Sequence, residues 1–569
     1  MSNIMNLKSL KNNVSRNGFD LSFKKNFTAK AGELLPVMCK EVLPGDVFKI
    51  ELSSFTRTQP INTAAFARIR EYYDFFFVPY NLLWNKSDTV LTQMYDNAQH
   101  ASSAGSTSLA PQGALNGQLP YISTSTLANY IYNLYNSEEA SADGKLYKNN
   151  FFGYNRADLS AKLLEYLGYG NFHYYLDHTH NWSTYPLCAD LKLNLFNILA
   201  YQKIYYDFYR DSQWEKTSPV CFNVDYLSGQ TAPGLDPSVI MKYTDKENIK
   251  YINMFDMRYC NWQKDLYHGV LPSPQYGETS YVVSDQRSNG GPDHSGTPTT
   301  VVDILMLRQA EFLQKWKEIA QSGDKDYKEQ VQKHWNVTPS DYSSEKCQYL
   351  GGTSSNIDIN EVVNTNITGD NAADIAGKGA GVGRGSINFE SQGRYGVLMC
   401  IYHCLPVLDY TTDMVDPSVT KVDAASFAIP EFDKVGMQPV FGSWMSNHVK
   451  PSGDGTGLST AELILGYAPR YIEYKTSVDQ SVGAFKRSLN SWVVSYGTES
   501  FVQSYRAGIM DPNANTVFNN YITFKVNPNS VDPIFAVAAA SSVNTDQFLC
   551  STFFDIKAVR NLDVDGLPY

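Results

Sequence analysis

Two long β-type segments near the amino terminus, within residues 30–84, constrain the fold more than any other part of the chain. The first follows a Pro44-Gly45 turn and carries apolar side chains through residues 47–55. The second, residues 68–78, has five aromatic side chains in a nearly continuous apolar run, which is typical of a strand covered on both faces. Because the next clear strands come hundreds of residues later, we expect one large sheet domain that carries long insertions.

The middle of the chain spaces its apolar residues as helices do, and the last third returns to β-type patterns. Helices are predicted over residues 87–97, 126–135, 157–167, 190–209, 303–321 and 327–335. The aromatic stripe of the 190–209 helix is most simply explained by packing against the sheet. Strands are predicted over residues 396–405, 464–474, 492–496, 521–526 and 548–556.

A set of motifs occurs along the chain in a fixed order. They are LPGDVFKIELSSFTRTQP, EYYDFFFVPYNLLW, YQKIYYDFYRDSQWE, RYCNWQKDLYHGVLPSPQYGE, LRQAEFLQKWKEIAQSGDKDYKEQVQKHWNV, YLGG, GYAPRYIEYKTSVDQSVGAF and TDQFLCSTFFDIKAVRNL. In this order they resemble the major capsid protein of microviruses, in the gokushovirus-like branch of small icosahedral phages with single-stranded DNA. The resemblance reaches from about residue 30 to residue 565 and is weakest over residues 101–186, 217–250 and 279–300.

The resemblance implies a mainly β fold, a viral jelly-roll β-sandwich or barrel with long, partly helical insertion loops. We then expect residues 1–30 to form a basic N-terminal arm and residues 31–569 to form a single jelly-roll domain. The insertions are expected at about residues 87–210 (helical), 217–300 (a surface protrusion around the threefold axes that meets the host) and 303–385 (helices plus a glycine-rich linker).

The same resemblance implies a structural function with no enzymatic step. It implies a T = 1 icosahedral shell of sixty copies, with pentamers as assembly units, around circular single-stranded DNA. The expected location is the virion, after assembly in the cytoplasm of the bacterial host. A small basic DNA-binding protein, a pilot protein and a host-surface receptor are the further partners to expect, and no membrane is among them.

Composition leaves a second class of function open. Charged residues make up 18% of the chain and aromatic residues 13%, with 39 tyrosines. A tyrosine-rich, weakly charged surface suits extensive protein contact, and it equally suits sugar binding. The alternative is therefore a carbohydrate-binding or glycan-cleaving β-sandwich protein, and a scaffolding or spike protein is a third possibility. The formal net charge of −11 argues against a surface that is basic overall.

The candidate nucleic-acid-binding residues lie in the first 30 residues, which sum to about +5 against an acidic remainder. We expect this arm on the inner surface of the shell. An ordinary frayed terminus is the alternative interpretation. The cations expected near phosphates are Lys8, Lys11, Arg16, Lys24 and Lys25, and the rings expected to stack on bases are Phe19, Phe23 or Phe27.

No motif for catalysis or for phosphate binding is complete. The glycine-rich segment over residues 377–385 lacks the spacing of a phosphate loop, because Gly379 stands where a serine or threonine must bind magnesium. A flexible linker with two cationic residues is the favoured interpretation. Serine-hydrolase, zinc-peptidase and cysteine-nucleophile signatures are missing as well. We therefore predict no enzymatic activity and no cofactor.

Two clusters have the residue types of a metal site without its geometry. On a strand, Cys400 and Cys404 share one face while His403 points the other way, so one ion would not reach all three. Buried thiols are the better interpretation. The cluster His173, Asp177, His178 and His180 matches no standard zinc spacing, and no metal is predicted.

Overall fold

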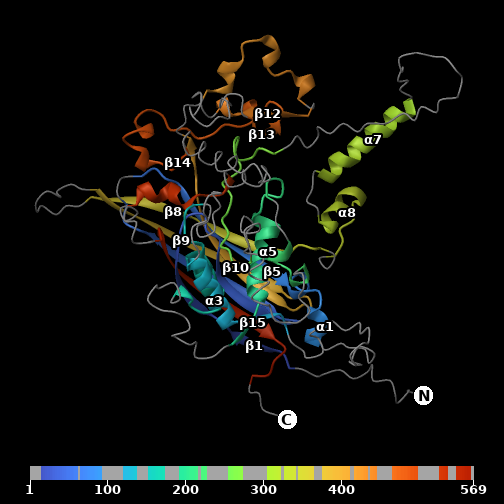
Figure 1. Cartoon of the computed structure of the whole chain (residues 1–569), viewed down its shortest axis with the longest axis vertical. Coiled ribbons are helices and arrows are strands. Elements are labelled where there is room, and N and C mark those ends of the chain that lie inside the picture. Colours follow the sequence, from blue (N-terminus) through green and yellow to red (C-terminus); the bar gives the residue numbers. More distant parts are fainter. Residues whose placement is uncertain are drawn as a thin grey trace, which may run out of the picture.

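The computed structural model describes most of the chain, with gaps at the amino terminus and in several loops. The described residues are 15–61, 65–92, 119–136, 152–173, 191–215, 219–226, 254–272, 304–321, 326–340, 344–363, 375–410, 415–433, 436–444, 464–496, 524–535 and 546–564. They form a large curled sheet with helices on one side and a smaller lobe above it (Figure 1).

The sheet contains nine strands, and every neighbouring pair in it is antiparallel. The strands are β1 (Asn17–Asp20), β2 (Phe23–Ala29), β3 (Leu35–Val42), β4 (Val47–Thr58), β5 (Ile69–Pro79), β8 (Gln348–Val363), β9 (Ile375–Glu390), β10 (Gly396–Pro406) and β15 (Phe548–Arg560). Their order is β1-β15-β4-β9-β8-β5-β10-β3, with β2 also paired to β15. The hairpin of β8 and β9 thus joins two halves of the sheet.

The two halves face each other, because side chains from distant positions in the strand order meet inside. The Tyr73 hydroxyl of β5 lies 2.8 Å from the Thr552 hydroxyl of β15. The Tyr402 ring of β10 lies edge-on to Phe27 of β2 at 5.0 Å, and Cys550 of β15 donates to its hydroxyl at 3.4 Å. The sheet therefore curls around a closed interior, and the expected mainly β, sandwich-like fold is confirmed.

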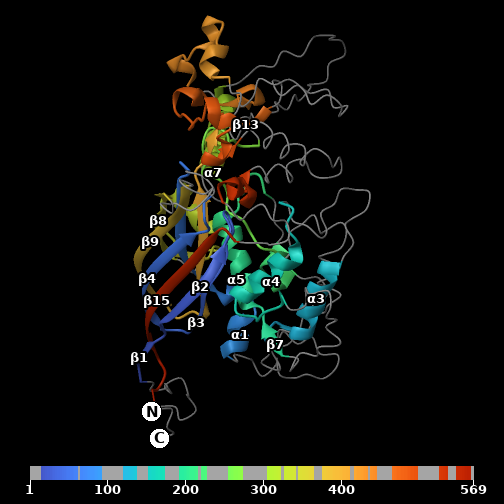
Figure 2. The same cartoon turned by 90° about the vertical axis from the view of Figure 1, so that its left-hand side faces the viewer.

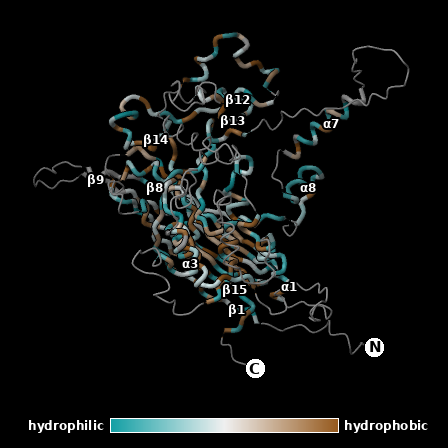
Figure 3. The backbone as a smooth tube through the Cα atoms, in the orientation of Figure 1, coloured by the Kyte–Doolittle hydropathy of each residue, from teal (hydrophilic) through white to brown (hydrophobic). Residues whose placement is uncertain are grey.

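Residue alternation explains which faces of the strands are buried. In β4, Phe48, Ile50 and Leu52 are buried while their neighbours are exposed, and β15 alternates in the same way. In contrast, β5 and β10 are buried along most of both faces, as the continuous apolar run over residues 68–78 predicts. Figure 3 shows hydrophobic residues gathered in the strands of this sheet.

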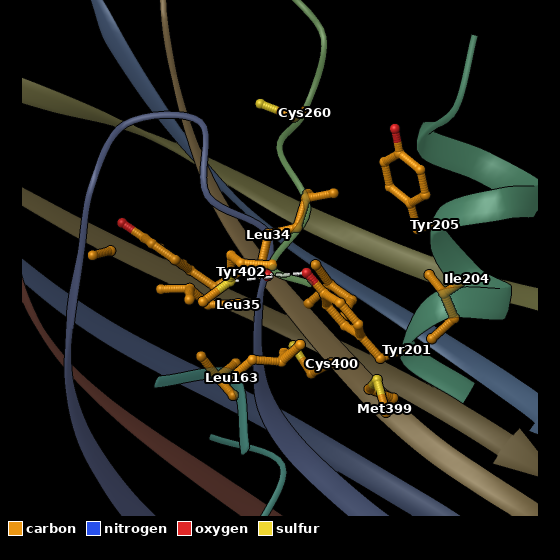
Figure 4. Packing of buried hydrophobic residues seen from close by; sticks show 14 of the residues in the cluster. Leu34, Leu35, Leu163, Tyr201, Ile204, Tyr205, Cys260, Met399, Cys400 and Tyr402 are labelled. Carbon is orange, nitrogen blue, oxygen red and sulfur yellow. Dashed lines mark hydrogen bonds between the residues drawn. The ribbon is translucent and has the colours of Figure 1, made fainter. Parts of the chain in front are cut away.

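Helices cover one side of the sheet, as Figure 2 shows. The described helices are α1 (Ser87–Thr92), α3 (Thr124–Asn136), α4 (Arg156–Tyr166), α5 (Phe196–Ile204), α7 (Ile304–Gln321) and α8 (Tyr327–Trp335). Helix α5 packs on β5 and β10, and α4 packs on β3. Tyr201 of α5 donates from its hydroxyl to the Leu34 carbonyl at 2.9 Å, which ties the helix to the chain before β3 (Figure 4). None of these helices is both long and apolar enough to cross a membrane.

A predicted helix and a predicted strand are shorter than expected. The helix predicted from residue 190 begins only at Phe196, because Lys192–Asn194 forms strand β7 against β6 (Tyr121–Ser123); it then ends in a π-helical turn, η5 (Tyr205–Tyr209). The strand predicted over 464–474 ends at Pro469. Tyr471 there has a φ of 59°, which no extended strand accommodates.

The upper lobe contains two small sheets. Strands β12 (Met437–Phe441) and β13 (Ile464–Pro469) pair antiparallel, while β11 (Asp409–Tyr410) and β14 (Ser495–Tyr496) pair parallel. The strand predicted over residues 492–496 is reduced to the two residues of β14, and a second strand is predicted over residues 521–526. In the described part of the second, Lys525 forms an isolated bridge with Asn261.

The glycine-rich segment is not a flexible linker, which corrects the expectation for residues 377–385. It forms most of β9, paired to β4 and β8. Its alternate glycines face the interior, where a β-carbon on Gly379 would lie 2.7 Å from Thr58 Cγ2 and one on Gly383 would lie 2.6 Å from Ser54 Oγ. Side chains would not fit there, so glycine at every second position lets the sheet turn from one half to the other.

The expected arm is also shorter than residues 1–30. Strands β1 and β2 pair with β15 from Asn17 to Ala29, so these residues belong to the sheet and the boundary moves to a point before Asn17. The physical reason is that exposed polar residues of β2 alternate with less exposed ones, among them Phe23, Phe27 and Ala29, which face the interior. Residues 1–14 lie outside the described part of the chain.

Candidate nucleic-acid interface

The structure separates the cations that were predicted to contact phosphates. Lys8 and Lys11 lie outside the described residues. Arg16 donates to the Gly45 carbonyl at 3.0 Å. Lys25 is partly buried, donates to the Tyr166 carbonyl at 3.1 Å, and has its pKa lowered by that burial. Among the described members of the set, Lys24 alone is exposed without such a contact.

The predicted stacking role is wrong for two of the three phenylalanines. Phe23 stacks on Phe554 at 5.1 Å and packs against the core, and Phe27 is buried against Tyr402. Both rings occupy the inward positions of β2, so they are not available to bases. Phe19 on β1 is half-buried.

A different set of residues forms an open surface beside Lys24. The outward side chains of β2, β15, β4 and β9 are not covered by any described helix, and Figure 2 shows these strands opposite α3, α4 and α5. The strand register aligns these side chains in lateral rows. The rows are Lys24, Phe553, Ser53, Arg384; then Asn26, Ser551, Phe55, Val382; then Thr28, Leu549, Arg57, Ala380. We call this surface the bare sheet face.

The bare sheet face combines exposed rings with cations. Phe553 is 45% exposed and Phe55 39%, and they occupy diagonal positions on adjacent strands, roughly 7 Å apart. Lys24, Arg57 and Arg384 surround them, and no carboxylate of the described residues lies within ion-pair distance of these three. The Arg57 guanidinium lies 5.0 Å from the centre of the Phe55 ring.

The opposite end of the same face is electrically neutralised. Lys49 pairs with Glu51 at 2.8 Å. Lys557 pairs with Asp20 at 2.6 Å and Asp555 at 3.2 Å, and its hydrogen bond holds the pKa of Asp20 well below the usual range. Free positive charge is therefore concentrated around the two phenylalanines.

Exposed aromatic rings flanked by unpaired cations suit single-stranded nucleic acid. Bases stack on the rings regardless of sequence, while the cations contact the phosphates. Sequence reasoning identified Lys24 and missed Phe55, Phe553, Arg57 and Arg384. The signal was present, since strands with clear alternation carry rings at outward positions where solvent-exposed polar residues are expected.

The structure describes the first of the two metal-like clusters in full and only one residue of the second. Cys400 and Cys404 face the closed interior of the sheet, whereas His403 stacks on Tyr72 at 4.8 Å, so the strand separates them as predicted. The seven cysteines that the structure describes are free thiols. His173 lies 3.7 Å from Glu165, and its three predicted partners over residues 177–180 fall outside the described part. Within the described residues no cluster of metal ligands occurs.

His403 makes the stability of the subunit depend on pH. Burial lowers its pKa from 6.5 to about 4, against the opposing charge of Asp74 at 3.7 Å. The unfolded chain takes up this proton near pH 6.5 and the folded one only near pH 4, so stability is lost as the pH falls through that window, by at most about 3 kcal/mol. The His403→Phe variant keeps a ring against Tyr72. We expect its melting temperature to fall less between pH 7 and pH 4.5 than that of the wild-type protein. Equal losses in both proteins would contradict the assignment.

Comparisons with known proteins agree on one family. A family model described as "Capsid protein (F protein)" matches residues 8–137 and 293–569, which is more than half of the chain. Capsid protein VP1 of Chlamydia phage 1 is 20% identical, over 98% of this chain and 96% of its own length. Capsid protein VP1 of Bdellovibrio phage phiMH2K is 22% identical, over 84% of this chain and 85% of its own.

Proposed function

This chain belongs to the capsid protein (F protein) family, and we propose that sixty copies of it form a T = 1 icosahedral shell around circular single-stranded DNA. It is a structural capsid protein of the microvirus type, which implies self-assembly and a place in the virion. Pentamers are the proposed assembly units, formed in the cytoplasm of the bacterial host.

The bare sheet face is the proposed inner surface of this shell. It carries exposed rings and unpaired cations on a protein whose formal net charge is −11, so it is the part of the described surface best suited to polyanionic DNA. Helices α3, α4 and α5 lie on the opposite side of the sheet and would then face outward (Figure 2). Residues 1–14, with Lys8 and Lys11, would add to the inner surface.

The remaining parts of the proposal concern the outside and the other partners. The expected protrusion over residues 217–300 is corrected in its middle, because residues 254–272 contribute Phe255, Arg258 and Trp262 to the buried core. The rest of this segment, most of which lies outside the family match, is the proposed protrusion that meets the host receptor. A small basic DNA-binding protein would supply further positive charge, since three cations per copy neutralise only a fraction of a genome. We propose no enzymatic step. The alternative, a carbohydrate-binding or glycan-cleaving protein, is not supported by the similarity to capsid proteins.

A triple variant tests the inner-surface assignment. Replacing Lys24, Arg57 and Arg384 by glutamine should leave shells intact, because these side chains are exposed and have no described ion-pair partner. Three lost phosphate contacts, at roughly 0.7 each, should lower the slope of log DNA affinity against log salt by about 2. The measurement is DNA retained by purified shells, or bound by pentamers, across a salt series.

The matched control is the double variant Lys49→Gln and Lys557→Gln on the same face, where both cations already have carboxylate partners. It should change the salt slope much less than the triple variant does. If the triple variant and the control have the same slope, the DNA lies elsewhere and the assignment is wrong. Retention of wild-type protein on a glycan column, without shells, would favour the carbohydrate alternative.

A further inference from the structure

Helices α7 and α8 form a hairpin that projects beside the body of the molecule (Figure 1). The Trp316 ring of α7 stacks on His334 of α8 at 5.9 Å, and the Gln330 side chain donates to the Ala320 carbonyl at 3.0 Å. The base of α8 is fixed to the strand that follows, because the Asp326 carboxylate accepts hydrogen bonds from the chain just before β8.

This hairpin has aromatic side chains on its surface instead of in a core. Phe312 is 68% exposed, Trp316 56%, Tyr327 61% and Trp335 70%. Among the side chains of α7 and α8 that the structure describes, none is fully buried. Tyr327 and Trp335 are eight residues apart and so lie on one side of α8, as Phe312 and Trp316 do on α7. We call these four residues the aromatic hairpin face.

Two helices of this kind need a partner surface. Most of the stability of a helix in a protein comes from packing of its apolar face, and these faces have almost nothing to pack on within the described chain. Large exposed aromatic patches mark protein interfaces, whose centres are enriched in tryptophan, tyrosine and phenylalanine. The aromatic hairpin face is therefore half of an interface.

We infer that the aromatic hairpin face binds a second copy of this chain in the assembled shell. This inference rests on the proposed function, because a capsid protein surrounds itself with copies of itself. The hairpin lies inside the segment 293–569 that matches the capsid family, whereas the proposed host-facing insertion lies mostly outside it. The face thus belongs to the part of the chain that matches the capsid family.

A neighbouring copy fits this face better than nucleic acid does. Lysines on the hairpin alternate with acids at helical spacing, with Glu311 four residues before Lys315 and Glu329 four residues before Lys333. The two helices carry five cations and three acids, a net charge of +2, so the face has only a small excess of positive charge with which to hold phosphates. Its apolar rings also need removal from water over their whole area, which packing against another protein surface provides.

The double variant Phe312→Ser and Trp335→Ser tests this interface. Both side chains are among the most exposed of the face, so the isolated subunit should fold normally, with its circular dichroism unchanged and its melting temperature within about 2 °C of wild type. The fraction of protein sedimenting as shells at a fixed concentration should fall roughly tenfold or more, because each lost contact recurs in every copy.

The matched control is Glu311→Ser with Lys333→Ser, which alters exposed polar positions of the same two helices and should assemble as wild type does. If wild type and the aromatic double variant form shells equally well, the inference is wrong and the proposed function stands. If the double variant forms normal shells that lose only their DNA, the face binds nucleic acid and the inference is also wrong. Wild-type protein that never assembles would overturn both.

Discussion

Replacing Gly383 by valine is expected to prevent the subunit from folding, and with it the formation of any shell. Gly383 lies in the middle of β9 at an inward position, between β4 and β8. A β-carbon there would lie 2.6 Å from Ser54 Oγ, closer than β-carbons come to other atoms, and 3.0 Å from Ser355 Oγ, which is tighter than nine in ten such contacts. Because one flanking strand lies on each side, neither can move away without breaking its own pairing.

The two hydroxyls beside Gly383 belong to a buried polar network, which increases the cost of moving them. Ser355 donates to the Glu71 carboxylate at 2.6 Å, Thr56 donates at 2.5 Å and Ser54 at 3.4 Å, and Glu71 is fully buried. Hydrogen bonds to a charged group contribute about 1.5–3 kcal/mol each, and overpacking alone costs about 1–3 kcal/mol. The sum is a large part of the stability of an ordinary domain.

The matched control for this substitution is Ser386→Val, on the same strand but exposed to solvent. It adds the same β-branched side chain where there is room, and should leave soluble yield and melting temperature nearly unchanged. The measurement is the soluble yield of each protein, followed by urea unfolding where enough is recovered. A Gly383→Val subunit that unfolds at the same urea concentration as the control would show that the interior has space that the distances exclude.

The strands of the sheet could be predicted from the sequence wherever the apolar residues either alternate with polar ones or form a continuous run. Residues 47–55 alternate and residues 68–78 are apolar throughout, and these became a strand with one open face and a strand with two covered faces. Residues 377–385 also alternate with period two, but between glycine and other residues, a composition that is typical of a flexible linker. The interior of β9 has no room for side chains, so the apolar residues that normally reveal a buried strand are missing there.

The candidate site was predictable only in part, because the contacting residues come from four strands that register brings together. Lys24 was identified from local charge, but its neighbour Phe553 is more than 500 residues away along the chain. Composition near the amino terminus also does not distinguish the outward Lys24 from the inward Phe23 and Phe27 until the strand is placed against β15. The pairing of β2 with β15 determines which of these side chains face outward.

Replacing Glu215 by alanine is expected to destabilise the subunit by about 3–5 kcal/mol, because it leaves two buried cations without their carboxylate. Glu215 is hydrogen-bonded to Tyr205 of η5 and is almost fully buried. The Lys525 ammonium lies 3.3 Å from one of its oxygens and the Arg258 guanidinium 4.0 Å from the other, both cations being buried as well. The Tyr205 hydroxyl donates to the same carboxylate at 2.6 Å.

The conservative variant and an exposed control separate charge from packing. Glu215→Gln keeps an acceptor for Tyr205 and loses only the charge, so its loss of stability should be smaller than that of Glu215→Ala. The control Glu165→Ala removes a carboxylate that is half exposed, and such a change costs about 0.5 kcal/mol or less. The free energy of unfolding, measured by urea titration, should therefore be highest for the control, lower for Glu215→Gln and lowest for Glu215→Ala.

The pH dependence of the alanine variant provides a second test of the same cluster. Burial lowers the pKa of Lys525 below its ordinary value, and without Glu215 the attraction that opposes this shift is lost. A lysine whose pKa is lower in the folded chain than in the unfolded chain loses its destabilising effect as the pH rises. We therefore expect Glu215→Ala to recover part of its stability between pH 7 and pH 9.5, while Arg258, which keeps its charge throughout, prevents full recovery. Stability that is equally independent of pH in wild type and variant would mean that Lys525 is already neutral when the carboxylate is present.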